Sequence, residues 1–226
     1  MRIDILSVVP KSMESHLQSS IIEKAIKKGI AEVHLHDLHD YSSDKHKKVD
    51  DYLYGGNSGM LLKCEPVFTC IEKLKSERTY DEIIYVSADG EKYNQSTANK
   101  LSLMKNIIIL AGHYKGIDQR IRDVLITQEI SIGDYVLTGG ELPALVITDS
   151  IIRLLPGSIG DSTAALSDSF QSGLLDSPQY TRPEIFREYK VPEVLLSGHH
   201  KNIEKWIEVQ SYEKTKRLRP DLLENE

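Results

Sequence analysis

The sequence is poor in cysteine and in long hydrophobic runs, and these scarcities exclude several classes of protein. Its two cysteines, Cys64 and Cys70, have no second pair beside them, so neither a disulfide framework nor a zinc site is supported. We expect both to be reduced and buried. The longest aliphatic run, residues 107–111, is too short to span a bilayer, and Asp4 interrupts the apolar start that a signal peptide needs. We therefore expect a cytoplasmic protein with no membrane partner.

Two common nucleotide-binding motifs are also missing. The sequence contains no Gly-x-Gly-x-x-Gly fingerprint and no Gly-x-x-x-x-Gly-Lys-Ser/Thr loop. It does contain a glycine-rich stretch, residues 132–143, in which the pair Gly139-Gly140 is followed by Glu141, whose charge would repel phosphates. This loop suits a neutral heterocycle or a cationic group better than a polyphosphate. Taken alone, however, it is more typical of a tight turn with a helix cap.

The net charge of −6 argues against indiscriminate binding of nucleic acid, but two basic patches lie within this acidic sequence. One patch is residues 45–48. The other, residues 199–219, carries six lysines and arginines against three glutamates. Judged by charge alone, the second patch is as typical of a solvated helix face as of a surface that contacts RNA.

The order of apolar segments predicts an α/β fold. Near-continuous runs of Ile, Val and Leu alternate with segments of helical spacing, which indicates a parallel sheet with helices on both faces. A length of 226 residues suggests one main domain with a smaller appendage. The aperiodic stretch 41–59 is expected to be a long surface loop with a functional role. The expected strands are residues 3–9, 31–38, 82–86, 106–111 and 124–130, and the expected helices are 13–28, 64–74, 96–104 and 142–155.

Small residues follow three successive predicted strands. Ser87-Ala88 follows the first, residues 112–116 follow the second, and the glycine-rich stretch follows the third. Because ligands of parallel α/β sheets bind beyond the carboxyl ends of the strands, this placement favours a pocket over three unrelated turns.

Three histidines near residue 36 could be imagined as metal ligands with Asp40. Alternation along a strand puts only His34 and His36 on one face and leaves His39 apart. We favour histidines on a strand surface, and predict no metal site.

Several motifs together resemble one bacterial enzyme family over essentially the whole length. The motifs are Tyr54-Gly55-Gly56 with Gly59-Met60, Gly112-His113-Tyr114-Lys115-Gly116-Ile117-Asp118-Gln119-Arg120, residues 132–143, Asp168-Ser169-Phe170, Gly173-Leu174-Leu175-Asp176, Tyr180-Thr181-Arg182-Pro183 and Leu195-Leu196-Ser197-Gly198. By the order and spacing of these motifs, the chain resembles the bacterial tRNA (guanine-N1)-methyltransferases, the TrmD family of the SPOUT superfamily.

The resemblance implies an S-adenosyl-L-methionine-dependent enzyme that methylates N1 of guanosine 37 in tRNA. It implies a knotted SPOUT domain over residues 1–157, a flexible linker over 158–173 and a small all-helical domain over 174–226 that holds the tRNA anticodon arm. Deep trefoil knots are rare exceptions among folds. Family members are homodimers with composite active sites, and a magnesium requirement is a further implication, although no ligand cluster for Mg²⁺ is visible in the sequence.

The resemblance also implies site residues. Removing the proton from guanine N1 needs a base, which falls on Asp168, and the charge that spreads toward O6 needs a cation, which falls on Arg153. Without the motif, Asp168 would be interpreted as a helix cap and Arg153 as a surface residue. The implied RNA contacts are His46, Asp50, Gly59, Asp176 and Ser197. The implied cofactor contacts are Tyr85, Val86, Ser87, Gly112, Tyr114, Gly116, Ile132, Gly133, Asp134, Tyr135, Val136, Leu137, Gly139, Gly140 and Pro143.

The chain departs from the family pattern at Tyr52-Leu53, Asn57-Ser58, Ala88, Lys115 and His199. Lys115 stands where glutamate is common, and a cation beside a sulfonium is unfavourable unless the side chain points elsewhere. Two alternatives stay open at this point. One is a knotted methyltransferase with a different RNA target, and the other is a non-catalytic RNA-binding dimer.

Overall fold

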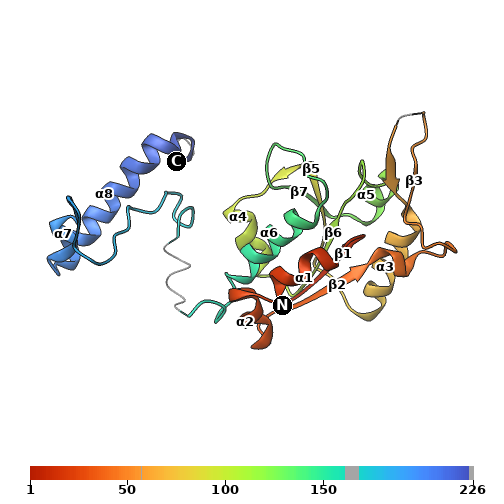
Figure 1. Ribbon diagram of the computed structural model, residues 1–226, viewed down its shortest axis with the longest axis horizontal. Coiled ribbons are helices and arrows are strands. Elements are labelled where there is room, and N and C mark those ends of the chain that lie inside the picture. Colours follow the sequence, from red (N-terminus) through yellow and green to blue (C-terminus); the bar gives the residue numbers. More distant parts are fainter. Residues whose placement is uncertain (57, 161–167, 224–226) are drawn as a thin grey trace. The chain divides into compact units, whose positions relative to one another are not determined.

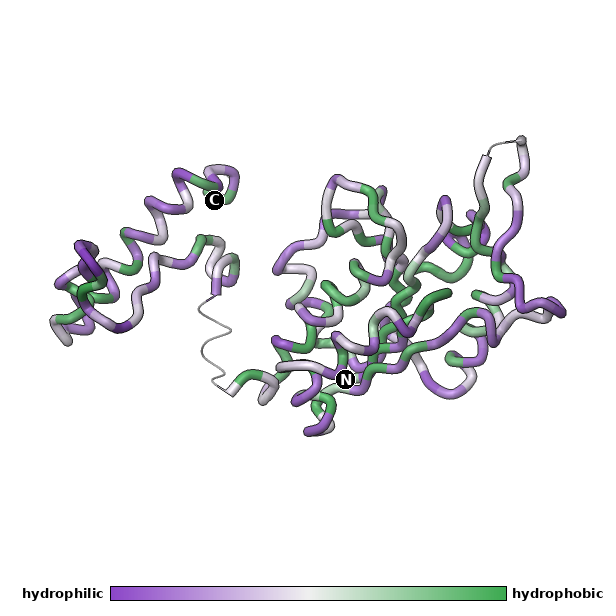
Figure 2. Tube along the Cα trace, in the orientation of Figure 1, coloured by the Kyte–Doolittle hydropathy of each residue, from purple (hydrophilic) through white to green (hydrophobic). Residues whose placement is uncertain are grey.

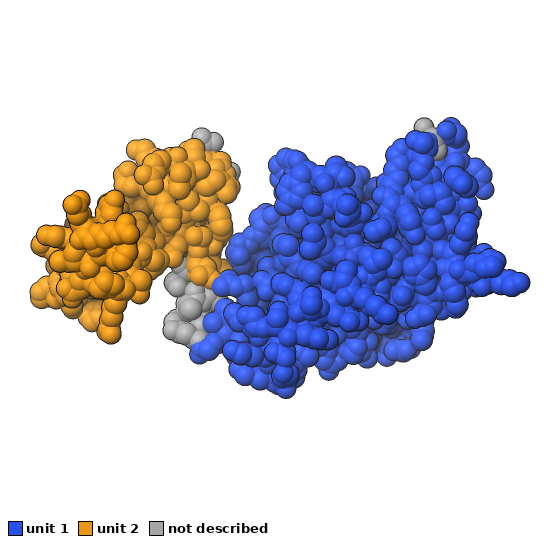
Figure 3. All heavy atoms as spheres, viewed as in Figure 1, with its two compact units in different colours: residues 1–160 blue, residues 161–226 orange. Residues whose placement is uncertain are grey.

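A computed structural model describes residues 1–56, 58–160 and 168–223 of the chain. The chain divides into two compact units, Met1–Gly160 and Asp161–Glu226, which Figure 3 shows in different colours. Residues 161–167, within the predicted linker, lie outside the described residues. Within the described ranges, no helix combines the length and hydropathy needed to cross a membrane.

The first unit is built on a five-stranded sheet in which every neighbouring pair is parallel. The strand order is β2-β1-β6-β5-β7 (Figure 1). The apolar runs explain the burial of the central strands, since a parallel sheet is covered on both faces. The strands are β1 (Arg2–Ser7), β2 (Glu32–Asp37), β5 (Glu82–Lys92), β6 (Asn106–Ala111) and β7 (Gln128–Ser131).

Helices cover both faces of this sheet, so the prediction of a parallel α/β sheet is confirmed. Alternate residues of β6 serve two separate cores: Ile107 and Ile109 pack with one set of helices, and Ile108 and Leu110 pack with the other. The first core receives α1 (Lys11–Leu17), α2 (Ser20–Lys27), α4 (Gln95–Ser102) and α6 (Glu141–Ile152). The second receives α3 (Cys64–Glu77) and α5 (Gln119–Leu125). Apolar segments therefore converge on the sheet in Figure 2.

Three predicted boundaries differ from the observed elements. The helix expected over 13–28 is two helices, because the chain turns at Ser20, whose φ of 56° lies in the left-handed region. The strand expected over 124–130 begins only at Gln128, since Leu125 still belongs to α5. β5 extends past the predicted end at residue 86, with an irregularity between Val86 and Glu91.

The predicted surface loop 41–59 contains more structure than expected. A short 3-10 helix, η1 (Leu38–Tyr41), precedes it, and β3 (Asp50–Tyr52) pairs antiparallel with β4 (Met60–Leu62). Backbone hydrogen bonds attach β4 to the segment after β6: Lys115 N donates to Met60 O at 3.0 Å, and Leu62 N donates to Gly116 O at 3.0 Å. This hairpin is consequently fixed beside the carboxyl end of β6.

The two cysteines are free thiols on α3. Cys70 is buried as expected, whereas Cys64, the first residue of the helix, is only partly buried. Burial raises the pKa of the Cys64 thiol to about 11 and that of Cys70 to about 12. Both are therefore protonated at neutral pH and serve as packing groups.

The second unit is dominated by one long helix, α8 (His200–Leu218), preceded by α7 (Glu193–Leu196) and followed by η3 (Pro220–Leu222). Thr215 is buried against the segment before these helices, where its Oγ1 accepts a hydrogen bond from Leu175 N at 2.9 Å. Tyr180 packs near Trp206 with ring centroids 6.4 Å apart. A small antiparallel pair, β8 (Ile185–Phe186) and β9 (Tyr189–Lys190), adds to the helices that the sequence predicted.

Candidate functional site: a pocket at the carboxyl edge of the sheet

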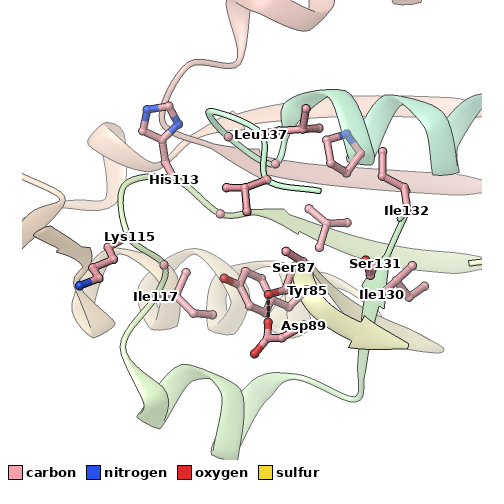
Figure 4. A pocket seen from close by; sticks show the side chains of 18 of the residues that line it. Tyr85, Ser87, Asp89, His113, Lys115, Ile117, Ile130, Ser131, Ile132 and Leu137 are labelled. Atoms are coloured by element: carbon pink, nitrogen blue, oxygen red, sulfur yellow. Dashed lines mark hydrogen bonds between the residues drawn. The ribbon is translucent and has the colours of Figure 1, made fainter. Parts of the chain in front are cut away.

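A pocket of about 430 Å³ opens at the carboxyl ends of β6 and β7, beside residues 85–89 of β5. Its volume falls in the range of about 300–1,000 Å³ that is usual for sites of small molecules and cofactors. Figure 4 shows side chains from the three loops turned around one space. These loops are the ones that follow the predicted strand ends, so the sequence argument located the pocket correctly. The walls include Val86, Gly112, Ile132, Gly133, Leu137, Thr138 and Pro143.

Two of these loops are joined through their backbones. Gly140, which caps α6, donates its N–H to Gly112 O at 2.7 Å. A Cβ on Gly140 would lie 2.7 Å from Gly112 N and 2.8 Å from Ala111 Cα, closer than real Cβ atoms approach. Glycine is therefore required here so that the loop can reach the end of β6. The space that a side chain at Gly140 would need is taken by protein atoms of the neighbouring loop and strand.

Tyr85 forms one side of the pocket, and a charged cluster lies against its ring. Gly112 admits this ring, because a Cβ there would lie 2.8 Å from Tyr85 Cε2. The guanidinium of Arg122 sits 5.5 Å from the ring centroid and donates to Glu129 Oε1 at 2.7 Å and to Asp89 Oδ2 at 2.9 Å. Burial raises the pKa of Tyr85, so this wall is a neutral aromatic surface.

The β3–β4 hairpin borders the pocket on another side. The carboxylate of Asp50, the first residue of β3, lies beside the pocket residue Tyr114. Burial raises the pKa of Tyr114, and the charge of Asp50 and a hydrogen bond to it raise this pKa further. Gly59 lies against Lys115, with 3.3 Å between its Cβ position and Lys115 Cδ. The Nζ of Lys115 donates to Ser58 O at 3.3 Å. In Figure 4 this side chain points away from the enclosed space, so its cation is directed at a carbonyl.

The structure brings the predicted cofactor residues together with one exception. All of them line the pocket except Asp134, whose carboxylate accepts a hydrogen bond from Lys92 Nζ at 2.6 Å on the surface. Several other pocket residues were not among the predicted cofactor contacts, and the charged pair Asp89 and Arg122 is among them. A charged residue directly after a strand end was a signal for Asp89, but nothing in the sequence pointed to Arg122.

The predicted catalytic pair is divided between the two units. Arg153 follows α6 as its C-cap and is partly buried in the first unit, whereas Asp168 belongs to the second unit. The carbonyl of Asp168 accepts a hydrogen bond from Gln171 N at 3.3 Å, in a turn.

The remaining predicted RNA residues are polar groups that lie outside the strands and helices. His46 is exposed in the first unit, where its N–H donates to Asp44 Oδ1 at 2.7 Å. In the second unit, Asp176 N donates to Ser169 Oγ at 2.9 Å, next to Asp168. Ser197 follows α7 and donates its hydroxyl to Val194 O at 2.7 Å.

The three histidines of the β2 region each pair with a separate carboxylate. His36 Nε2 lies 2.7 Å from Asp4 Oδ1, and His39 Nδ1 lies 2.7 Å from Asp37 Oδ1. His34 lies 3.5 Å from Glu32 on the surface. Throughout the described part of the chain, no group of three or more His, Cys, Asp or Glu residues could hold a metal ion.

The fold and the pocket define a class of protein: a parallel α/β protein that binds a small molecule at the carboxyl edge of its sheet. Comparison narrows this class to one family. The chain belongs to the family described as tRNA (Guanine-1)-methyltransferase TrmD, whose model matches residues 1–225. The resemblance inferred from the motifs is therefore confirmed.

Individual relatives agree with this assignment. The chain is 58% identical over 226 residues to the tRNA (guanine-N(1)-)-methyltransferase of Christiangramia forsetii, with 100% of both chains covered. It is 57% identical over 225 residues to the protein of the same name from Bacteroides thetaiotaomicron, again with 100% of both covered. Among solved structures, it resembles the tRNA (m1G37) methyltransferase from Aquifex aeolicus with a TM-score of 0.79 at 37% identity, covering 99% of this chain and 94% of that one.

Proposed function

We propose that this protein transfers a methyl group from S-adenosyl-L-methionine to N1 of guanosine 37 in tRNA. Membership of the TrmD family, with full-length relatives named tRNA (guanine-N(1)-)-methyltransferase, supports the reaction. The name of the Aquifex aeolicus enzyme supports position 37. The observation that carries the proposal is the pocket at the carboxyl ends of β6 and β7, beside residues 85–89 of β5, where the family motifs of residues 112–116 and 132–143 lie.

The pocket residues fit S-adenosyl-L-methionine. The adenine ring is neutral and flat, and suits a wall made of the Tyr85 ring and aliphatic side chains such as Leu137. Backbone groups of the glycine-rich loop can supply hydrogen bonds to its edge. The cationic sulfonium suits a site in which Lys115 turns its charge toward Ser58. When bound, the cofactor supplies a methyl group attached to a positively charged sulfur.

The chain's own contribution is to hold guanine and to move one proton. Guanine N1 carries a hydrogen, which must leave as the methyl group arrives. We assign its acceptance to the carboxylate of Asp168, and we assign to the guanidinium of Arg153 the stabilisation of negative charge at O6. A positioned general base is typically worth about 10²–10⁴-fold in rate.

The proposed assembly is a homodimer with composite active sites, in which Asp168 of one chain serves the cofactor pocket of its partner. Exposed apolar residues on α6 of the first unit support a second copy as the occupant: Leu142 is 60% exposed, and Val146, one turn later, is 46% exposed. The second unit, with its basic helix α8, would hold the anticodon arm of tRNA. The trefoil knot, a cytoplasmic location and any use of Mg²⁺ belong to the same proposal.

Methyl transfer to paired tRNA transcripts tests the reaction. The two transcripts would differ only in carrying guanosine or adenosine at position 37, and labelled S-adenosyl-L-methionine would report the product. We expect label on the guanosine transcript alone, and a fall of about 10²–10⁴-fold in kcat for Asp168→Asn with cofactor binding retained. Measurable cofactor binding with no label on either transcript would contradict the proposal, in favour of another RNA target or a binding-only role.

A further inference from the structure

Glu141 is a buried carboxylate directly behind the glycine-rich loop. It is the first residue of α6, and its Oε1 accepts a hydrogen bond of 2.7 Å from the hydroxyl of Ser7, at the end of β1. Its other oxygen, Oε2, faces His113 Nδ1 at a distance of 3.9 Å. One carboxylate therefore stands between the end of β1 and the loop that follows β6. Because buried carboxylates are costly unless they are partnered, the placement of both oxygens needs an explanation.

His113 is the residue opposite the second oxygen of Glu141. Its Nδ1 is buried and has no hydrogen-bond partner among the residues that the structure describes. A separation of 3.9 Å is too long for a hydrogen bond, whereas a charge-assisted bond would need about 2.7–2.9 Å. A shift of roughly 1 Å would satisfy both the imidazole and the carboxylate. Figure 4 places His113 at the side of the pocket where the loop carries Leu137, so a ligand can reach both.

Gly139 explains why this gap can close. A Cβ at this position would collide with Glu141 Oε2 and would lie 2.8 Å from His113 Nδ1. The absence of a side chain at Gly139 thus leaves the line between carboxylate and imidazole open. The next residue already binds the His113 loop through the bond from Gly140 N to Gly112 O. A side-chain bond from His113 to Glu141 would add a second tie between the same two loops.

We infer that His113 is a positioning residue for the cofactor, which acts by closing onto Glu141 when the pocket is filled. This inference rests on the proposed function, because it takes S-adenosyl-L-methionine as the occupant. Ser7 holds Glu141, Glu141 receives the Nδ1–H of His113, and the two loops on either side of the ligand are fixed relative to each other. The imidazole does not touch the reacting atoms. Its effect is on how tightly the cofactor is held.

Calorimetric titration with S-adenosyl-L-methionine tests this role. We expect His113→Leu, which removes the donor, to weaken binding about tenfold or more, as the loss of a hydrogen bond to a charged group does. His113→Asn places an amide donor near the position of Nδ1 and should restore binding to within about threefold of the unaltered protein. His34→Leu is the matched control, because His34 also lies near a carboxylate, Glu32, but on the exposed surface of β2. It should bind normally.

Two further measurements separate positioning from general damage to the fold. The KM for S-adenosyl-L-methionine should rise about tenfold in His113→Leu while kcat changes less than about threefold. Amide hydrogen exchange of Gly139 and Gly140 should slow on cofactor binding in the unaltered protein and slow much less in the variant. In a Glu141→Gln background, His113→Leu should have little additional effect, because the two residues act as a pair.

The outcomes distinguish this inference from the proposed function. Failure of the unaltered protein to bind S-adenosyl-L-methionine would overturn both. Normal binding by the unaltered protein and equally tight binding by His113→Leu would overturn the inference alone. Fully additive effects of the His113 and Glu141 substitutions on binding would also overturn the inference alone. The same holds if both His113→Leu and His113→Asn lose thermal stability and His113→Asn fails to restore binding.

Discussion

Gly140 illustrates how a residue that lines a pocket can be required for the packing of the segments around it. Its missing side chain lets the N-terminus of α6 approach the end of β6, where Ala111 and Gly112 lie within 2.8 Å of the position that a Cβ would take. The opposite side of the loop is then presented to the pocket. Glycine here is a requirement of packing between two loops, and the shape of the pocket follows from it.

Gly140→Ala should consequently weaken the binding of S-adenosyl-L-methionine by at least about tenfold, because overpacking of this kind costs about 1–3 kcal/mol and must displace backbone atoms. Calorimetric titration measures the effect. Gly160→Ala is the control, since a Cβ at Gly160 would meet nothing within 4 Å, and its affinity should be unchanged. Equal affinities of the two variants would show that the loop tolerates the extra methyl group.

Asp4 is a second residue whose surroundings lead to a testable prediction, here about the pH dependence of stability. It is fully buried in β1, and burial alone would raise its pKa. Hydrogen bonds from His36, Arg2 and Tyr80 outweigh burial and hold the pKa of this carboxyl well below its usual range. A folded-state pKa below the unfolded value of about 3.9 means that the carboxylate contributes stability above about pH 5 and loses it as the pH falls.

Asp4→Asn should therefore lower the free energy of unfolding by roughly 3–5 kcal/mol at pH 7, the usual cost of breaking a buried charged pair. The difference from the unaltered protein should shrink between about pH 5 and pH 3, as the native carboxylate loses its advantage. Urea denaturation followed by circular dichroism at several pH values measures both. Asp134→Asn, which breaks the exposed pair with Lys92, should change stability by less than about 1 kcal/mol. A pH-independent difference for Asp4→Asn would refute the assignment.

At the scale of elements, the β3–β4 hairpin decides what Lys115 does. Backbone bonds between Lys115 and Met60, and between Leu62 and Gly116, hold the hairpin against the pocket segment. The Lys115 ammonium then finds Ser58 O within 3.3 Å instead of the pocket interior. A lysine at this position is compatible with a cationic ligand because the hairpin supplies an acceptor outside the pocket.

Lys115→Met should leave the affinity for S-adenosyl-L-methionine within about twofold of the unaltered protein, since the charge that it removes is exposed and directed outward. Titration at low and at physiological salt measures this. Arg120→Met is a suitable control, because Arg120 is an exposed cation of the same segment that pairs with Asp118 at 2.8 Å. Tighter binding by Lys115→Met alone, by tenfold or more, would mean that the ammonium faces the ligand.

The elements also show what the sequence could and could not predict. Strands such as β6 were predictable because a run of isoleucine and leucine needs burial on two faces. The hairpin was not, since the three residues of β3 have no apolar alternation and their pairing depends on contacts far along the chain. The turn at Ser20 was hidden because helical spacing continues across it.

The same contrast applies to the candidate site. The three loops around the pocket could be predicted because small residues follow strands, and strand ends of a parallel sheet meet at one edge. Arg122 could not be predicted. Its place beside Tyr85 depends on the irregularity of β5 after Val86, which brings Asp89 to the guanidinium, and no local pattern encodes that contact. Contacts between charged residues that are brought together only by the tertiary structure cannot be predicted from the periodicity of the sequence.

For the whole molecule, the central question is which pocket Asp168 serves. The cofactor pocket and Arg153 belong to the first unit and Asp168 to the second. An active site that needs both can be completed within one chain or between two chains. The proposed homodimer places Asp168 at the partner's pocket. In that case, two chains that are each defective can together form one intact site, which a site within a single chain does not allow.

Dimers of two different variant chains test whether Asp168 acts across subunits. One chain would carry Asp168→Asn and the other Gly140→Ala, with two affinity tags to isolate the heterodimer. If Asp168 acts across subunits, one site combines an intact pocket with an intact base. At S-adenosyl-L-methionine concentrations well below saturation, methyl transfer should then return to about half that of the unaltered dimer, whereas Asp168→Asn alone is nearly inactive and Gly140→Ala alone is at least about tenfold slower. If Asp168 serves its own chain, both sites carry a defect and the heterodimer should stay below about a tenth of the unaltered activity.

The reversed arrangement gives the decisive control. Here one chain carries both substitutions and its partner carries neither. Action across subunits then leaves every site defective, because the intact pocket receives the substituted residue 168 and the intact Asp168 meets the damaged pocket. Action within a chain leaves the unaltered chain fully competent. The two heterodimers hold the same substitutions in the same number, so opposite activities can arise only from the route by which Asp168 reaches guanine, and activity in the second dimer with none in the first would refute the composite site.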